Sequence, residues 1–152
     1  MAPEDAGMRY LSVAYAVRKA VDDHMTAGGL SLARTKVLQV LDRAGPLSQA
    51  ALASELGFAA RSVSQAVEAL EHEGLVKREP HPDDRRARLV LLTAEGSAAL
   101  AAGTAAGERV LRQIFGGLDQ KDLANLHGLL DSVEKSVAQA ARTPPGSRPR
   151  GR

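Results

Sequence analysis

The residues with the clearest chemical character lie in the stretch HPDDRRARLVLLTAEG, from His81 to Gly96. Its first half combines one proline and two aspartates, which favour turns, with three arginines at positions 85, 86 and 88. Short apolar runs lie on both sides of this tip, and the pattern predicts a β-hairpin. Guanidinium groups bind anions through paired hydrogen bonds, so we expect the tip to contact an anionic partner.

Two short helical patterns precede the hairpin. The first, SQAALASEL, starts at Ser48, whose side chain can cap it, and ends at Gly57. The second, ARSVSQAVEALEHEG, places Val63, Val67 and Leu70 at helical spacing before a glycine. Helix, tight turn, helix and hairpin together predict a winged helix-turn-helix, a module that reads DNA.

The outward side of the second helix holds the candidates for base contacts. In its first turns the residues that do not face the core are Arg61, Ser62, Ser64 and Gln65. Arg61 can donate two hydrogen bonds to guanine and Gln65 can pair with adenine, each giving about 1–3 kcal/mol of base discrimination. The two serines could equally hold phosphates.

The composition favours one small helical domain. Of the 152 residues, 44% are hydrophobic and only four are aromatic, so the core must consist of Ala, Leu and Val. Four of the 20 basic residues are arginines after Ala141, and the rest of the chain carries 16 basic and 18 acidic residues. The net charge is therefore weak evidence for DNA binding, and the five basic residues between Leu75 and Leu92 matter more.

Several function classes are disfavoured. The absence of cysteine excludes disulfides and thiolate sensing, and the histidines at positions 24, 72, 81 and 127 lack metal-ligand spacing, so we expect no metal and no cofactor. The chain shows no phosphate loop, paired catalytic carboxylates or nucleophile beside a base, and we expect no enzyme activity. With no membrane-length apolar run and no signal peptide, it is expected to be cytoplasmic, without a membrane partner.

Long helices are predicted on both sides of the module. One covers residues 8–28, and another, capped by Ser31, buries Val37, Leu38 and Leu41. Thr93 can cap a helix that reaches Phe115, and Asp119 can cap the next. That last helix carries a coiled-coil-like seam formed by Leu123, Leu126, Leu130, Val133 and Val137.

The seam could pack within one chain or against a second copy. A single winged helix offers only one side on which these helices can close, so a twofold homodimer is favoured. The remaining segment, RTPPGSRPRGR, is rich in Pro, Gly and Arg and cannot bury a core. It is expected to be either a solvated end or a basic arm that attracts phosphates.

At these residues the chain resembles the MarR family of bacterial transcriptional regulators. The matching segments are GPLS at Gly45–Ser48, LG at Leu56–Gly57, VSQAVEALEHEGLVKR at Val63–Arg78 and PDDRRARLVLLTAEG at Pro82–Gly96. The last is the most specific, because Asp84, Arg86, Thr93 and Gly96 fall at the family's wing spacing. The resemblance extends over residues 8–141 and implies a mainly α fold with a small β wing, with the terminal helices forming a dimerisation domain.

The resemblance also suggests roles in the wing. Arg86 is expected to enter the minor groove, where narrow A·T-rich segments concentrate negative potential. Asp84 would hold its guanidinium by a two-pronged ion pair from the same face of an extended strand. Arg85 and Arg88 are expected to contact phosphates, and Lys77 and Arg78 to be solvated charges.

One position departs from the family pattern. Family members usually place a hydroxyl at the start of the second module helix, where this chain has Ala59 and Ala60. A missing cap costs about 1 kcal/mol, so the helix start could be shifted or frayed. Ser62 could also serve as a substitute cap.

The resemblance implies a small aromatic or phenolic effector bound where the DNA module meets the dimer helices. The candidate ligand-binding residues are Tyr15, Arg18, His24, Arg34 and Leu38. Arg34 could pair with a ligand carboxylate, or it could be a surface or inter-helix ion-pair residue.

These patterns predict four regions: a flexible N-terminus at 1–7, a helical dimerisation region at 8–28 and 93–141, a winged helix-turn-helix at 31–92 and a disordered basic tail at 142–152. The expected function is sequence-specific binding of double-stranded DNA, with a homodimeric, ligand-relieved repressor acting on a pseudo-palindromic operator. An effector-independent architectural or constitutive DNA-binding protein stays open. A protein-contact winged helix is a third alternative, against which the arginine-rich wing argues.

Overall fold

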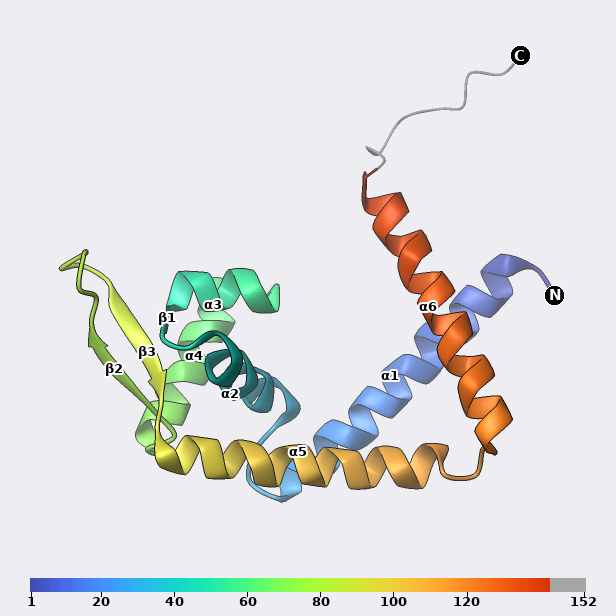
Figure 1. Cartoon of the computed structure of the whole chain (residues 1–152), viewed down its shortest axis with the longest axis horizontal. Coiled ribbons are helices and arrows are strands. Elements are labelled where there is room, and N and C mark those ends of the chain that lie inside the picture. The colour runs from blue at the N-terminus through green and yellow to red at the C-terminus, as the bar shows by residue number, and fades with distance from the viewer. Residues whose placement is uncertain (143–152) are drawn as a thin grey trace, which may run out of the picture. The chain divides into compact units, whose positions relative to one another are not determined.

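A computed structural model describes residues 1–142 of the chain (Figure 1). Two compact units make up this part, Met1–Arg112 and a second unit that begins at Gln113. The predicted basic tail lies outside the described residues except for Arg142, which belongs to the last helix.

The fold is mainly helical with a small β-sheet, as predicted. Its elements are α1 (Pro3–Ala27), α2 (Leu32–Ala44), β1 (Leu47–Ser48), α3 (Gln49–Leu56), α4 (Ala60–His72), β2 (Val76–Pro80), β3 (Arg88–Leu92), α5 (Ala94–Phe115) and α6 (Gln120–Arg142). The helix-turn-helix is formed by α3 and α4, and the wing by β2, β3 and their connection.

Side-chain caps set the start of four helices. Ser31 accepts from the amide of Arg34 at 3.2 Å, and Ser48 accepts from that of Ala51 at 3.1 Å. Thr93 and Asp119 accept in the same way from the third residue after them, at 3.0 Å and 2.8 Å. These bonds satisfy amides that have no partner inside the helix, and all four predicted caps are confirmed.

The N-terminal segment corrects one prediction. Residues 1–7 are not a loose end, because α1 begins at Pro3, five residues earlier than expected. Proline fits the first helical position, and Glu4 and Asp5 place negative charge in the first turn, where the helix dipole favours it. The Asp5 carboxylate also accepts from the amide of Ala2 at 3.2 Å.

A three-stranded antiparallel sheet has the order β1-β3-β2. Val76 pairs with Leu92 at the base of the wing and Pro80 with Arg88 near its tip, while Leu47 of β1 pairs with Val90. Strand β1 has only two residues, too few for an alternating pattern, and the sequence analysis missed it.

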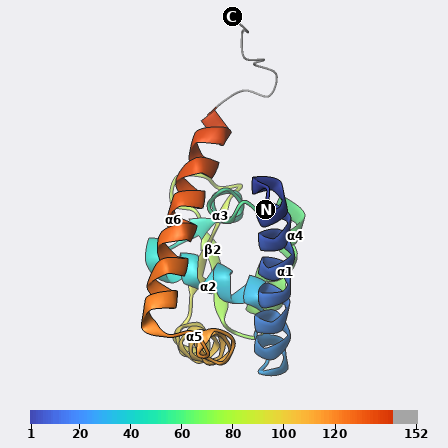
Figure 2. The ribbon, with the colours of Figure 1, turned by 90° about the vertical axis from the view of Figure 1, so that its right-hand side faces the viewer.

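The core of the first unit lies between α2, α3, α4 and the sheet. Its fully buried side chains are Leu38, Leu52, Leu70, Val37, Val63, Val67, Val76 and Val90. Leu100 of α5 adds to this cluster. Figure 2 views α5 end-on, with α1 beside it. Val21 and Met25 of α1 pack with Val110 of α5 in a second cluster.

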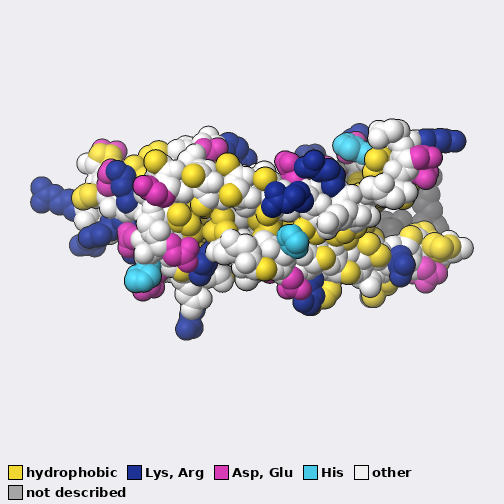
Figure 3. All heavy atoms as spheres, turned by 90° about the horizontal axis from the view of Figure 1, so that it is seen from below, with side chains coloured by type: hydrophobic (Ala, Val, Ile, Leu, Met, Phe, Trp, Pro, Cys, Tyr) yellow, Lys and Arg dark blue, Asp and Glu magenta, His cyan; other side chains and the backbone are white. Residues whose placement is uncertain are grey.

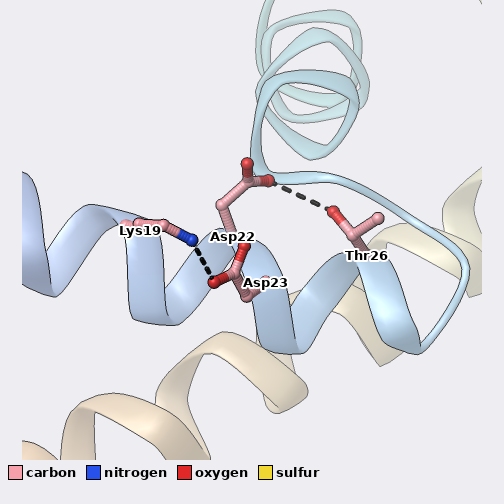
Figure 4. Close-up of polar contacts among 4 residues, drawn as sticks. All are labelled: Lys19, Asp22, Asp23 and Thr26. Carbon is pink, nitrogen blue, oxygen red and sulfur yellow. Dashed lines mark hydrogen bonds and ion pairs between the residues drawn. The ribbon is translucent and has the colours of Figure 1, made fainter.

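Asp22 ties the end of α1 to the start of α2. Its carboxylate accepts from the amide of Leu32 at 3.0 Å. It also accepts from the hydroxyl of Thr26 at 3.3 Å (Figure 4). Nearby, Lys19 donates to Asp23 at 2.7 Å, and this hydrogen bond raises the pKa of the exposed ammonium. Stabilisation from the pair is complete at neutral pH and is lost only as the pH rises through that raised pKa.

Helix α6 of the second unit buries no residue of its own. Large apolar side chains on it are exposed, among them Leu130 at 40%, Val133 at 48% and Val137 at 62%. A largely apolar groove of about 510 Å³ runs along it, lined by Leu129, Ser132, Val133, Ser136, Val137 and Ala140. The predicted seam therefore lies on one face of α6, with Leu130, Val133 and Val137 exposed and Leu123 and Leu126 half-buried.

We expect Gly96→Ala to destabilise the protein by about 1–3 kcal/mol, the usual cost of overpacking. A Cβ at this position would overlap the carbonyl oxygen of Leu75 and lie 2.8 Å from a methyl of Leu92. Gly128→Ala is the matched control: nothing lies within 4 Å of its Cβ, and alanine favours helix by about 1 kcal/mol. Urea unfolding measures both, and equal stability of Gly96→Ala and the wild type would contradict this packing.

Candidate nucleic-acid interface

Helix α4 presents one polar face to solvent. Val63, Val67 and Leu70 on its inner side are fully buried. Of the predicted DNA-contacting residues, Arg61, Ser62 and Gln65 are exposed, as expected, whereas Ser64 is half-buried. The burial of the apolar side thus determines which side chains of α4 a ligand can reach.

The first residue of α4 is not shifted along the chain, and no later residue caps the helix in place of the missing hydroxyl. The helix begins at Ala60, and its N-cap residue, Ala59, makes no side-chain hydrogen bond. Phe58 packs against the core just before it, and its amide donates to the carbonyl of Ala53 at 3.2 Å. We attribute the position of the helix start to this anchored entry, and Ser62 stays on the exposed face instead of capping.

Two of the three acids on α4 and at its C-cap are paired with arginines of α2 and β2. Arg34 Nη1 of α2 lies 2.8 Å from Glu73 Oε1, and Arg78 Nε of β2 lies 3.8 Å from Glu71 Oε2. Arg78 is only 24% exposed, and its Nε is buried without a hydrogen bond, so the prediction of a solvated charge was wrong. In each pair, an arginine of the first unit neutralises the negative charge of the acid.

The wing carries exposed arginines at its tip. Arg85, Arg86 and Arg88 are all exposed, and none forms an ion pair with another residue in the range 1–142. Figure 3 shows basic side chains projecting at the left, where the wing ends. Lys77 on β2 is exposed and pairs with Glu79 at 3.0 Å. The tip therefore offers guanidinium groups that are free to bind an anion.

Asp84 does not act as predicted. Its carboxylate accepts from the backbone amide of Arg86 at 2.9 Å, and no ion pair joins the two side chains. Its carbonyl accepts from the amide of Ala87 at 3.2 Å, while His81 Nδ1 accepts from the amide of Asp83 at 3.0 Å. The tip is thus a series of turns and not an extended strand, because a short carboxylate satisfies the nearest backbone donor. Asp84 shapes the tip and leaves the Arg86 guanidinium free.

Thr93 joins the wing to its neighbours. Its hydroxyl donates to the carbonyl of Gly74 at 2.7 Å and accepts from the amide of Gly96 at 3.0 Å. Its own amide donates to the carbonyl of Leu75 at 3.1 Å. One residue therefore connects the turn after α4, the base of the wing and the start of α5. The sequence analysis identified only its capping role.

The predicted effector residues are not gathered around one cavity. Leu38 is fully buried in the core, so its assignment to a ligand cleft was wrong: it lies on the inner side of α2 beside Val37. Arg34 is engaged with Glu73, as the ion-pair alternative held. Tyr15, Arg18 and His24 lie exposed on α1.

A shallow groove of about 440 Å³ lies between α2 and α5. Its lining residues are Gln39, Asp42, Ser97, Leu100, Ala101, Thr104, Ala105 and Glu108, and none of the five predicted effector residues is among them. Residues 1–142 contain no cluster of three or more His, Asp or Glu side chains placed to hold a metal. None of the helices in this range has the length and apolar character needed to cross a membrane.

Comparison with known proteins gives consistent results. Residues 28–87 match the sequence model of the MarR family. The chain is 25% identical over 109 residues to YdgJ of Bacillus subtilis (strain 168), an uncharacterized HTH-type transcriptional regulator, with 72% of this chain and 66% of YdgJ covered. It is 34% identical over 83 residues to the transcriptional regulator HosA of Escherichia coli O111:H-, covering 55% of this chain and 61% of HosA. The chain thus spans less than two thirds of the length of these curated relatives.

The fold also matches solved structures. A crystal structure of a mutant MarR from Escherichia coli complexed with operator DNA superposes with a TM-score of 0.70 and 23% identity, over 84% of this chain and 91% of that chain. At this identity the similarity concerns the fold, which includes the winged helix-turn-helix and the long helices that flank it.

We expect Asp84→Ala to speed amide hydrogen exchange at Arg86 by up to about tenfold, the equivalent of one lost hydrogen bond. Asp84→Asn keeps an acceptor oxygen and should exchange as the wild type does. Asp83→Ala is the control, since only its backbone amide bonds within the tip. Equal exchange in Asp84→Ala and Asp83→Ala would mean that the Asp84 carboxylate does not order the tip.

Proposed function

We propose that this chain, whose residues 28–87 match the MarR family model, is a sequence-specific transcriptional regulator of that family that binds double-stranded operator DNA as a homodimer. The observation that carries this proposal is the pairing of an exposed polar face on α4 with a wing tip whose arginines have no acidic partner among the described residues. The Escherichia coli MarR variant of the same fold was crystallised with operator DNA. Such a regulator acts in the cytoplasm.

The two surfaces suit different parts of a duplex. In a helix-turn-helix the second helix lies in the major groove, where Arg61 and Gln65 of α4 would contact base edges. Ser62 and the half-buried Ser64 would hold backbone phosphates. The wing would follow the backbone, with Arg86 in the minor groove and Arg85 and Arg88 on phosphates, since free guanidinium groups bind phosphate strongly.

The homodimer is supported by apolar side chains that each unit leaves uncovered. On α1 of the first unit these are Met8 at 67%, Leu11 at 61% and Tyr15 at 69% exposure. On α6 of the second unit the exposed seam and its groove are also apolar. Exposed apolar patches of this kind mark protein–protein contacts. In a twofold homodimer, the same patches would be covered on both copies of the chain. A twofold dimer would in turn favour a pseudo-palindromic operator with half-sites about 34–36 Å apart.

Repression relieved by a small aromatic acid is the regulatory part of the proposal. Arg34 is the candidate contact, because its side chain is 33% exposed and its partner Glu73 is the C-cap residue of α4. A ligand carboxylate that took the place of Glu73 would break the ion pair between α2 and the end of α4. It would change DNA affinity to the extent that the ligand binds the DNA-free and DNA-bound conformations with different affinity.

Effector-independent DNA binding is the alternative, and the scatter of the five predicted effector residues favours it. Gel shifts on the DNA upstream of the protein's own coding region, with and without benzoate-type acids, distinguish the two. A ligand-responsive regulator releases DNA when the acid is added, whereas an effector-independent protein does not.

We expect Arg86→Ala to weaken operator binding by about 10- to 100-fold, the usual range for a DNA-contacting arginine. The dimer should persist, because this exposed side chain contributes nothing to the core. Arg109→Ala on α5 removes the same charge from an exposed position away from the module and is the control. Fluorescence anisotropy over a salt series measures affinity, and unchanged binding in Arg86→Ala would remove the wing from the mechanism.

We expect Leu126→Glu combined with Leu130→Glu to produce a monomer that no longer binds the operator. Dimerisation would then bury two unpaired carboxylates in the seam, and the free-energy cost of this burial exceeds the stabilisation from the remaining apolar contacts. Ala124→Glu with Gly128→Glu has the same spacing on the opposite side of α6 and should remain dimeric. Light scattering gives the oligomeric state, and a monomeric double variant with full DNA affinity would contradict the proposal.

A further inference from the structure

Glu68 differs from the other acids on α4 and at its C-cap. Glu71 and the C-cap residue Glu73 are held by Arg78 and Arg34, whereas the Glu68 side chain is exposed and makes no ion pair or hydrogen bond with any residue in the range 1–142. The residues one turn before and after it on α4 are Ser64, Gln65, Glu71 and His72, and none of them is Lys or Arg. A helix-stabilising pair with a neighbour therefore does not account for its presence.

Glu68 shares a row with the two predicted base-reading residues. At about 100° per residue, Arg61, Gln65 and Glu68 fall within about 60° of one another on α4. This row lies opposite the buried Val63, Val67 and Leu70. Arg61 and Glu68 are about 10 Å apart along the axis at 1.5 Å per residue. That length spans about three base-pair steps of roughly 3.4 Å.

The chemistry of a carboxylate limits what it can bind in a groove. An ionised carboxylate only accepts hydrogen bonds, and phosphate oxygens also only accept, so Glu68 cannot hold the DNA backbone. In the major groove the amino group of cytosine is the donor that a glutamate matches. From this, and resting on the proposed function, we infer that Glu68 is a specificity-determining residue that accepts from a cytosine amino group in each half-site.

With this assignment, the hydrogen-bonding character of the row changes from donor to acceptor along α4. Arg61 near the start of α4 donates, Gln65 in the middle both donates and accepts, and Glu68 only accepts. A base step that presented only acceptors to Glu68 would leave an unpaired carboxylate against the groove and be rejected. The residue therefore discriminates against wrong sequences as well as selecting the right one.

The test is selection of duplexes from a random library by the full-length protein, followed by competition binding. The wild type should enrich cytosine at one position of each half-site. Glu68→Gln should move that position toward adenine, which glutamine pairs with, and lower the preference for cytosine by about 10- to 100-fold. Glu68→Ala should lose the preference without gaining adenine. Positions that depend on Arg61 and Gln65 should be unchanged in both variants.

Glu134→Gln on α6 is the control, because it removes one exposed carboxylate outside the module. The inference is overturned if Glu68→Gln selects the same sequences as the wild type. It is also overturned if that variant binds all duplexes more tightly by the same factor, since Glu68 would then act only by repelling phosphates. In both cases the proposed function survives, whereas a wild type that selects no duplex would overturn the function together with this inference.

Discussion

The burial of one apolar side of α4 is the constraint on which the candidate interface depends. Val63, Val67 and Leu70 are fully buried among α2, α3 and the sheet, and each contributes about 1.5–3 kcal/mol relative to an exposed side chain. Rotation of α4 about its axis would return these side chains to water. The same energy accounts for a helix that starts without a cap, because a missing cap costs only about 1 kcal/mol. The polar row that faces outward is thus held in place from behind.

A second constraint joins the elements of the candidate interface to one another. Thr93 bonds to Gly74, Leu75 and Gly96, so the turn after α4, the base of the wing and the first turn of α5 meet at one residue. Gly96 permits this because any larger residue would overlap the carbonyl of Leu75. A movement of the start of α5 would therefore be transmitted to α4 and to the wing together. Under the proposed function, such a movement would change DNA affinity, because that affinity depends on the positions of α4 and the wing.

Charge in this protein is informative only through pairing. The chain is close to neutral apart from its C-terminal arginines, and its overall balance says little about partners. Within the first unit, Arg34 and Arg78 pair with the C-cap residue Glu73 and with Glu71 of α4, while the arginines of the wing tip have no such partner in residues 1–142. The neutralised acids leave Glu68 as the one unpaired carboxylate of α4, on the face that the proposed function turns toward DNA. The proposed function therefore depends on the charged side chains that have no partner among the described residues, the arginines of the wing tip and Glu68.

The sequence by itself determined the features that depend on neighbouring residues. The caps Ser31, Ser48, Thr93 and Asp119, the left-handed Gly57 at the end of α3, the hairpin and the inward row of α4 are all set within about one helical turn or one strand pair, and all were predicted correctly. The early start of α1 was also encoded locally, by Pro3 and the two acids that follow it, although the sequence analysis missed it.

Only the tertiary structure decided which distant groups meet. Arg34 and Glu73 are 39 residues apart, and no periodicity reveals that they pair. Leu38 was assigned to a ligand cleft, but the packing of α2 places it in the core. Asp84 bonds a backbone amide instead of the Arg86 side chain, because the tip turns where an extended strand was expected. Local patterns specify backbone conformation through short-range hydrogen bonds and sterics, whereas side-chain partners depend on how separate elements pack, and a single sequence does not display that packing.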